Sequence, residues 1–170
     1  MAAEEGSAFA VVLEDLIDPS FALAYALLHH EAEAEDAVQD GLLRAWRKRR
    51  QFHDRGSGPR PWVLTIVANE CRDRLRSRWW HVRRHADLVV VETGAPVDAR
   101  AVFRADLERA LLRLSREQRA ALVLFYQLDL SQEEVAQVLG IKVGTVKSRL
   151  NRAVAALRKA MGEEDSDANA

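Results

Sequence analysis

The sequence is poor in cysteine, and this shortage excludes two kinds of site. Cys71 is the only cysteine among 170 residues, so neither an internal disulfide nor a cysteine-based zinc cluster can form. A lone cysteine in an apolar helical pattern is most often a core residue, which is the role that we predict for Cys71.

Long apolar runs are also missing. None approaches the roughly 20 residues that a membrane-spanning helix needs, and the acidic start with Glu4 and Glu5 is unlike a signal peptide. We therefore expect a cytoplasmic protein without membrane insertion.

Motifs for catalysis and for cofactors are scarce. There is no Gly-rich phosphate loop and no nucleophile elbow. His29 and His30 lie beside several glutamates, but adjacent histidines point about 100 degrees apart on a helix, and no His-x-x-x-His spacing with a glutamate occurs. The sequence therefore predicts no metal, no cofactor and no enzymatic activity of its own.

Charge is distributed unevenly along the chain, although the net charge is only -1. Residues 1–40 hold ten acidic residues and no lysine or arginine, whereas residues 41–80 hold eleven basic and three acidic residues. A second basic block, residues 131–160, holds six basic and two acidic residues, and the tail after Met161 is acidic. Two separated basic blocks on a nearly neutral chain indicate two contacts with a polyanion.

The apolar periodicity is helical nearly everywhere. It predicts helices over residues 9–30, with a break or kink at Pro19, over 31–50, and over about 62–80, where Trp62, Ile66 and Leu75 are expected to be buried. Glycines and prolines predict a loop over residues 51–61. Periodicity is lost from residue 81 to about 100, which indicates an extended linker, and a short strand at residues 88–91 is the alternative.

Helical patterns resume in the second half, where two start signals stand out. A helix is expected over residues 103–114. Ser115 with Gln118, and Ser131 with Glu134, fit the capping box, so helices should begin near residues 116 and 132. A last helix should run from about residue 143 to 161.

The segment SQEEVAQVLGIKVGTVKSRLNRA, residues 131–153, has the pattern of a helix-turn-helix. Ala136 allows the two helices to cross closely, Gly140 supplies the left-handed turn residue, and Ile141 fills the gap between the helices. Apolar residues at 143, 146, 150, 154 and 157 form one buried stripe, and the basic and polar residues off that stripe are free to meet DNA.

Two separate motifs resemble one bacterial family. EAEDAVQDGLLRAWRKRRQF, residues 33–52, and RPWVLTIVANECRDRLRSR, residues 60–78, resemble region 2 of the extracytoplasmic-function (ECF) group of sigma-70 factors. LLRLSREQRAALVLFYQLDLSQEEVAQVLGIKVGTVKSRLNRAVAALR, residues 111–158, resembles region 4 of the same group. Order and spacing agree for both halves.

The resemblance implies an all-α protein with two small helical domains joined by an extended linker. Region 2 would be a helical bundle over residues 1–80, followed by a linker over 81–102, a region 4 helix-turn-helix over 103–161 and an acidic tail over 162–170. Such a protein binds core RNA polymerase and promoter DNA and directs transcription initiation, and many members are controlled by an anti-sigma factor.

The resemblance also implies three sets of functional residues. Core polymerase would be bound by Asp36, Gln39 and Asp40, which lie on one helix face, whereas Trp46 is expected in the core. The minus-ten element would be bound by Phe52, His53, Asp54, Arg55, Asn69, Arg72, Arg74 and Arg76. The minus-thirty-five element would be bound by Lys142, Thr145, Lys147, Ser148, Arg149, Asn151 and Arg152.

Several positions depart from the family pattern or allow another interpretation. Lys142 replaces a serine that often caps the recognition helix, and Asn151 stands where histidine is frequent. Thr65 and Ala68 replace basic residues, and the roles of Trp79 and Trp80 stay open. Some arginines of residues 72–78 could pair with Glu70 and Asp73 instead of DNA.

One rival interpretation remains at this point. A conventional helix-turn-helix regulator with a sensing or dimerising N-terminal domain would carry the same recognition helix. It would bind a duplex operator by itself, usually as a dimer.

Overall fold

The computed structural model describes the backbone of residues 2–54, 56–82, 107 and 109–160, and the side chains of 6–54, 56–77, 107 and 109–160. Every regular element within these ranges is helical. The alternative strand at 88–91, the predicted linker apart from residues 81 and 82, the first residues of the helix predicted over 103–114 and the acidic tail lie outside them. No described helix has the length and apolar composition needed to cross a membrane.

The N-terminal region begins with two helices, α1 (Ala2–Asp15) and α2 (Ile17–Leu28). The predicted break is confirmed and lies at Leu16, three residues before Pro19, because the ring of a proline obstructs helical continuation from the residue four positions earlier. Pro19 lies in the first turn of α2, where backbone amides have no partner within the helix, so its missing N–H costs nothing. The amide of Leu16 instead donates to the carbonyl of Leu13.

Two adjacent histidines form the junction between α2 and the next helix, α3 (Glu31–Lys48). His29 adopts the left-handed conformation with φ 51° and ends α2, its amide donating to the Tyr25 carbonyl at 2.8 Å. His30 caps α3, since its Nδ1 accepts a hydrogen bond from the Glu33 amide at 3.3 Å. These histidines therefore have structural roles that the sequence pattern did not reveal.

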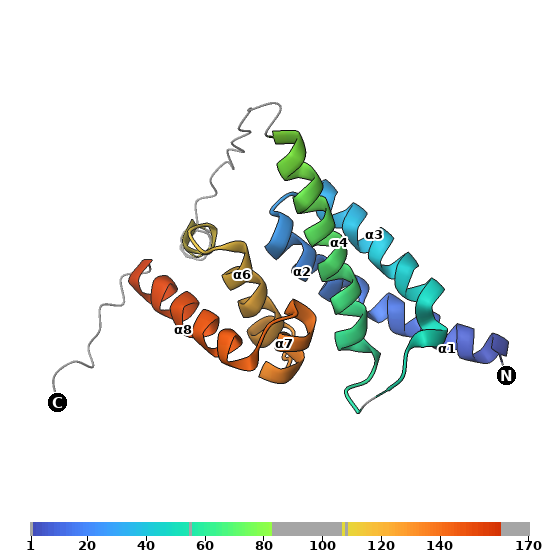
Figure 1. Ribbon diagram of the computed structural model, residues 1–170. Helices are drawn as coiled ribbons and strands as arrows, with labels where there is room; N and C mark the ends of the chain where they lie inside the picture. The colour runs from blue at the N-terminus through green and yellow to red at the C-terminus, as the bar shows by residue number, and fades with distance from the viewer. Residues whose placement is uncertain (1, 55, 83–106, 108, 161–170) are drawn as a thin grey trace, which may run out of the picture.

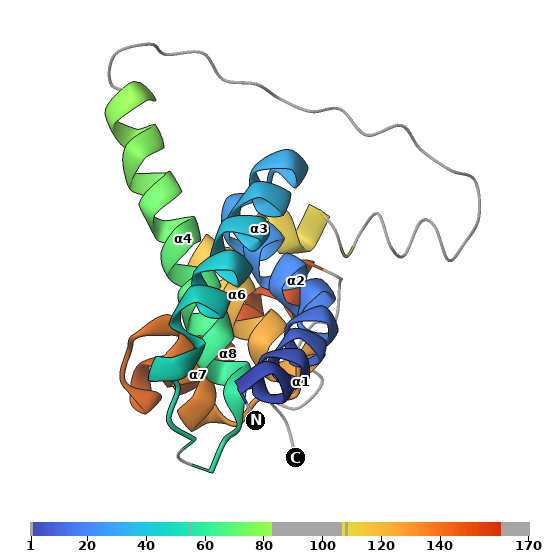
Figure 2. The same ribbon diagram turned by 90° about the vertical axis from the view of Figure 1, so that its right-hand side faces the viewer.

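After α3 the chain passes through a short 3-10 helix, η1 (Arg49–Gln51), and a loop to the long helix α4 (Pro59–Val82). Helices α3 and α4 approach closely at Gly41, where an added Cβ would lie 2.8 Å from Cγ2 of Val67. Figures 1 and 2 show α3 and α4 running side by side.

The C-terminal region contains α6 (Arg116–Leu122), the π-helical turn η2 (Val123–Gln127), α7 (Gln132–Leu139) and α8 (Val143–Ala160). Both predicted capping boxes are confirmed, at Ser115 with Gln118 and at Ser131 with Glu134. Of the helix predicted to precede them, residues 107 and 109–112 are helical.

The helix-turn-helix geometry follows the sequence prediction. Gly140 has φ 64° and ends α7, and the amide of Ile141 donates to the Ala136 carbonyl at 3.0 Å. Val146 and Leu150 of α8 are buried. The apolar stripe of the sequence is therefore the face that α8 turns toward α6 and α7.

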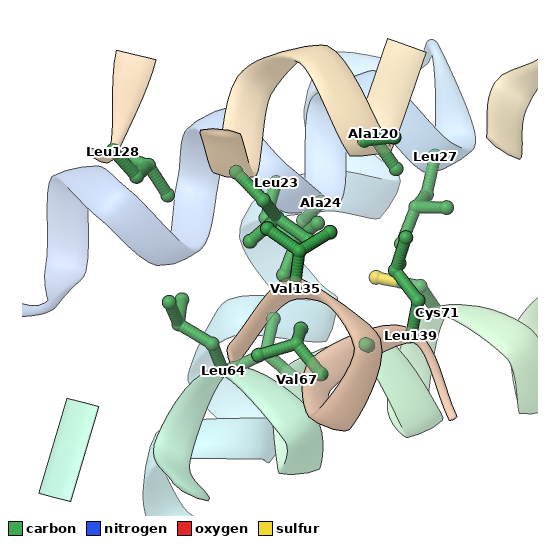
Figure 3. Close-up of a cluster of buried hydrophobic side chains, with 14 of the residues drawn as sticks. Leu23, Ala24, Leu27, Leu64, Val67, Cys71, Ala120, Leu128, Val135 and Leu139 are labelled. Atoms are coloured by element: carbon green, nitrogen blue, oxygen red, sulfur yellow. The ribbon is translucent and has the colours of Figure 1, made fainter. Parts of the chain in front are cut away.

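One apolar core joins the N-terminal and C-terminal regions. It contains side chains from α2, α4, α6 and α7, among them Leu23, Val67, Ala120 and Val135, none of which is exposed (Figure 3). In Figures 1 and 2, α7 lies against α4 on the side away from α3. Sequence periodicity predicted two helical regions, but it did not predict that they pack together.

This packing corrects the expected burial along α4. Trp62, Ile66 and Leu75 are only partly buried, whereas the fully buried side chains include Pro61, Val63, Leu64, Val67, Ala68 and Cys71. The reason is that α4 is covered from several sides, by α2, α3 and α7, so it has no single buried stripe. The prediction that Cys71 is a core residue is confirmed, because its side chain is 0% exposed.

Candidate nucleic-acid interface

An acidic face on α3 carries the three residues predicted to bind polymerase. Asp36, Gln39 and Asp40 are all exposed. The guanidinium of Arg74 on α4 lies across the two carboxylates, 2.5 Å from Asp40 Oδ2 and 3.9 Å from Asp36 Oδ2. Arg74 therefore holds these carboxylates in place, which no local sequence signal could show because the partners are on different helices.

A second ion pair joins the same two helices at greater depth. Arg44 of α3 lies 2.7 Å from Oε1 of Glu70, whose side chain is buried in α4. Glu70 thus pairs with α3 rather than with the arginines of its own helix. Trp46, which was predicted to be a core residue, packs against the apolar cluster formed by α1, α3 and α4.

The loop before α4 is organised by its own side chains. Asp54 Oδ1 accepts hydrogen bonds from the amides of Gly56 at 2.8 Å and Gly58 at 3.1 Å. The ring of Phe52 lies 5.4 Å from that of Trp62, and His53 Nδ1 lies 2.9 Å from the Gln51 carbonyl. His53 and Asp54 are exposed, so they can meet a base, while Arg55 lies outside the described residues.

The three arginines predicted to follow the DNA backbone on α4 all have partners within the protein. Arg72 donates to Oδ1 of Asn69 at 2.6 Å and also to carbonyls at the end of α7. Arg74 pairs with the acidic face, and Arg76 pairs with Asp73. The expectation that some of these arginines pair with Asp73 is confirmed for Arg76, while Glu70 is engaged by α3.

The residues predicted to contact the minus-thirty-five element lie off the apolar stripe of α8, and Lys142 lies directly before the helix. Lys142, Lys147, Asn151 and Arg152 are exposed, and Thr145, Ser148 and Arg149 are partly exposed. Arg149 and Arg152 also line a pocket of about 340 Å³ beside the start of α6. The structure thus leaves this face accessible.

The first turn of α8 lacks a side-chain cap, whereas α6 and α7 each have one. The carbonyl of Lys142 accepts hydrogen bonds from the amides of Thr145 at 2.9 Å and Val146 at 3.2 Å, so Lys142 occupies the cap position. A lysine side chain has no acceptor atom and cannot cap the free amides. The exposed ammonium of Lys142 is instead available to an anion.

The described titratable groups outside this face include no cluster suited to a metal ion. Among the side chains that the structure describes, no group of three or more His, Cys, Asp or Glu residues could hold a metal ion. Burial raises the pKa of the Cys71 thiol to about 12, which keeps it protonated and unreactive.

Comparisons with known proteins agree for both halves of the chain. Sigma-70 region 2 matches residues 14–81, and Sigma-70 region 4 matches residues 104–157. The chain is 38% identical over 143 residues to the ECF RNA polymerase sigma factor SigL of Mycobacterium tuberculosis, covering 82% of this chain and 81% of the relative. It is 30% identical over 165 residues to the ECF sigma factor SigW of Bacillus subtilis, covering 89% and 88%.

Solved structures give the same likeness in three dimensions. The sigma factor RpoE of Bartonella quintana, in complex with the anti-sigma factor NepR, superimposes with a TM-score of 0.78 at 31% identity, covering 91% of this chain and 96% of that chain. CnrH, in complex with the cytosolic domain of CnrY, superimposes with a TM-score of 0.63 at 26% identity and 96% coverage of both chains.

Proposed function

Because this chain belongs to the extracytoplasmic-function group of sigma-70 RNA polymerase sigma factors, we propose a role for each of its surfaces in promoter recognition. A factor of this group binds core RNA polymerase and directs promoter-specific transcription initiation. This group is not a class of enzymes, and we expect the polymerase to carry out the catalysis. The protein would act in the cytoplasm, where the polymerase is.

The acidic face of α3 is the proposed docking surface for core polymerase. Its two carboxylates and one amide are exposed, and they suit a basic partner helix. We expect Asp40→Asn to weaken binding of the full chain to core polymerase about tenfold, in the lower part of the range measured for charge pairs at protein interfaces. Glu35→Gln, another exposed carboxylate on α3, is the matched control and should leave the affinity unchanged. Equal affinities for the two variants would contradict the docking role.

The loop over residues 52–58 and the arginines of α4 form the proposed minus-ten site. An unpaired base needs a stacking surface and polar edges, which Phe52, His53 and Asn69 can supply. Arg72, Arg74 and Arg76 would bind phosphates once they leave their partners within the protein. Asp54, whose Oδ1 accepts two loop amides, would shape the pocket and offer its second oxygen to the base.

The exposed face of α8 is the proposed minus-thirty-five site, with Lys142 placed to meet a phosphate and Arg152 to meet a base edge. We expect Arg152→Ala to cost about 1 to 3 kcal/mol of promoter binding and to relax the base preference at one position. Lys159→Ala, in the last turn of α8, is the control that removes a charge without removing a base contact. Selection of promoters from a randomised library by holoenzymes carrying each variant distinguishes the two.

The observation that best supports the whole proposal is that one chain combines an exposed acidic face on α3 with basic side chains on two other helices, α4 and α8. A conventional helix-turn-helix regulator has no use for that combination. Run-off transcription with purified core enzyme over a genomic library tests it, and we expect products that start at defined promoters only when this protein is added. No promoter-dependent product, together with stable operator binding by the protein alone, would support the regulator instead.

Control by an anti-sigma factor is the proposed regulation. It is supported by the likeness to RpoE, which was solved with the anti-sigma factor NepR. Purification of the chain from its native cells should recover an inhibitory protein in stoichiometric amount. Recovery of active, unaccompanied protein would argue against sequestration.

We also propose that the chain is divided into region 2 (1–80), a linker (81–102), region 4 (103–161) and a tail (162–170).

A further inference from the structure

The end of α3 and the turn η1 are rich in cations that none of the proposed surfaces uses. The sequence reads RKRR over residues 47–50. The guanidinium of Arg49 is already engaged, because it lies 4.2 Å from the ring centroid of Trp46 and its Nη1 donates to the Trp46 carbonyl at 2.9 Å. Arg47 follows Asp36 by about three helical turns, so it continues the line of the acidic face.

Lys48 and Arg50 are the free cations of this segment. Both side chains are exposed, and neither has a hydrogen-bond or ion-pair partner among the residues that the structure describes. Arg72, Arg74 and Arg76 of α4, in contrast, all have partners within the protein. Lys48 and Arg50 can therefore bind a phosphate without breaking an existing contact.

Arg60 lies on the other side of the loop over residues 52–58, in the first turn of α4. Its side chain is partly buried, and its Nε is a buried donor for which the described part of the chain supplies no acceptor. A buried donor without a partner costs free energy. An anion would satisfy both this donor and the charge of the guanidinium.

The rings of Phe52 and Trp62 bring the two sides of the loop together, since their centroids are 5.4 Å apart. Arg50 precedes Phe52 by two residues, and Arg60 precedes Trp62 by two residues. Figures 1 and 2 show the loop joining α3 and α4 at one end of the two helices. The cations on both sides of the loop are therefore placed at this end, beside the aromatic pair.

The acidic side chain of this loop leaves these cations unpaired. Asp54 is the only carboxylate between residues 51 and 60. Its Oδ1 accepts hydrogen bonds from the amides of Gly56 and Gly58, and it forms no ion pair with a described residue. The surroundings of the loop are therefore positively charged.

The arginines of α4 lie far from this end of the helix. Because a helix rises about 1.5 Å per residue, Arg72 and Arg76 are roughly 18 Å and roughly 24 Å along the axis from Arg60. The phosphates next to a base stacked on Phe52 would thus lie nearer to the cations beside the loop than to the arginines of α4.

We propose that Lys48, Arg50 and Arg60 form a phosphate-binding site for the melted promoter strand, next to the base that the loop over residues 52–58 captures. We call these three residues the loop cations. The proposal rests on the proposed function, because it takes this loop as the minus-ten site. A groove of cations beside aromatic side chains is a common way to hold a single strand, whose backbone can follow the loop on both sides of an unstacked base.

The salt dependence of strand binding tests the loop cations. The protein is holoenzyme reconstituted from the full chain and purified core enzyme, and the probe is a fluorescent single strand that carries the minus-ten element found by run-off transcription. For a single strand, each phosphate contact contributes about 0.7 to the slope of log affinity against log salt. We expect Lys48→Gln and Arg50→Gln each to reduce the slope by about 0.7, and the triple variant with Arg60→Gln to reduce it by about 2.

Lys159→Gln is the matched control, since it removes the same charge from the exposed last turn of α8. Its slope should equal that of the wild type. Lys48 and Arg50 are exposed, so their substitution should leave the fold intact, which denaturant unfolding checks. Arg60 is partly buried, and Arg60→Lys, which keeps the charge, should retain the wild-type slope.

Uncharged phosphates locate the contact on the strand. Methylphosphonate replacing one phosphate at a time should weaken wild-type binding most at the phosphates next to the captured base. In Arg50→Gln, one of these replacements should have no further effect, because the contact that it removes is already lost.

Two results would overturn the role of the loop cations. One is a wild-type slope in the triple variant, and the other is an equal reduction of the slope in Lys159→Gln. Either result, together with promoter-dependent transcripts from the wild-type holoenzyme, would refute the loop cations and leave the proposed function intact. No promoter-dependent transcript from the wild type would refute both.

Discussion

At the scale of single residues, close helix contact depends on one glycine. Gly41 faces Val67 across the α3–α4 contact, and a Cβ at position 41 would also lie 3.2 Å from the Val67 backbone Cα, which cannot rotate away. The acidic face of α3 and the arginines Arg72, Arg74 and Arg76 of α4 lie on these two helices. Their relative position therefore depends on the absence of a side chain at residue 41.

We predict that Gly41→Ala lowers the free energy of unfolding by about 1 to 3 kcal/mol, the usual cost of overpacking a core. The control is Gly144→Ala in α8, where an added Cβ meets nothing within 4 Å. That substitution should leave stability unchanged or raise it by up to about 1 kcal/mol, because alanine favours a helix over glycine. Denaturant unfolding of both variants measures the difference, and equal destabilisation would contradict the contact.

We predict that His29 makes the free energy of unfolding depend on pH. Burial and then the positive charge of Arg119 lower the pKa of His29 in the folded protein. The unfolded chain therefore binds the proton more readily, so the free energy of unfolding should decrease as pH falls below about 6.5, the ordinary histidine value. His29→Asn, which also tolerates the left-handed conformation, should flatten this decrease between about pH 7 and pH 5.5. An unchanged slope in urea titrations over that range would show that His29 is not the group responsible.

At the scale of helices, side-chain caps set the start of α6 and of α7, whereas α8 begins without such a cap. Serine caps with a glutamine or glutamate at the third helical position begin α6 and α7, and these starts could be predicted because the capping atoms are close in sequence. Helix α8 has Lys142 at its cap position instead. The first turn of α8 is therefore less stable than it would be with a side-chain cap, but the exposed ammonium of Lys142 is available to an anion.

We predict that Lys142→Ser raises the stability of the protein and lowers its affinity for DNA. The new hydroxyl can accept from a free amide of α8, which should raise the free energy of unfolding by about 1 kcal/mol. Loss of the ammonium should weaken binding to the minus-thirty-five duplex and reduce its salt dependence by about one unit of slope. Lys142→Ala is the control, since it removes the charge without adding a cap. Higher stability in the alanine variant than in the serine variant would exclude the capping explanation.

At the scale of the whole molecule, the two family regions share one apolar core in the free chain. Side chains of α6 and α7 that would otherwise meet solvent are buried against α2 and α4. Such sharing makes the two regions depend on each other for stability, even though each corresponds to its own family region.

We predict that the free chain unfolds in a single cooperative transition. All four tryptophans precede residue 81, so their fluorescence reports region 2, whereas helical circular dichroism reports both regions. The two signals should change at the same temperature in the wild type. In Arg72→Ala the two midpoints should separate, because the interface that couples the regions is weakened. Separate transitions in the wild type would mean that the regions are independent.

Much of the fold and part of the site could be predicted from residues close in sequence. Apolar periodicity identified the helices, the capping boxes placed two helix starts, and Gly140 placed the turn of the helix-turn-helix. The exposed acidic and basic faces also followed from spacing along single helices, because a helix with a period of 3.6 residues sorts its side chains by face. The full burial expected for Trp62, Ile66 and Leu75 was wrong for the complementary reason, since it depended on which neighbours cover α4.

The sequence by itself determined the helical class, the turn chemistry and the separation of acidic from basic surfaces, because each depends on backbone preferences and local periodicity. Only the tertiary structure decided that α7 lies on α4, that Arg74 holds the acidic face, and that Arg72 and Arg119 join the two regions. These contacts link residues 34 to 93 positions apart and satisfy charges and carbonyls of other helices. No local pattern encodes such partners, because they arise from the packing of complete helices.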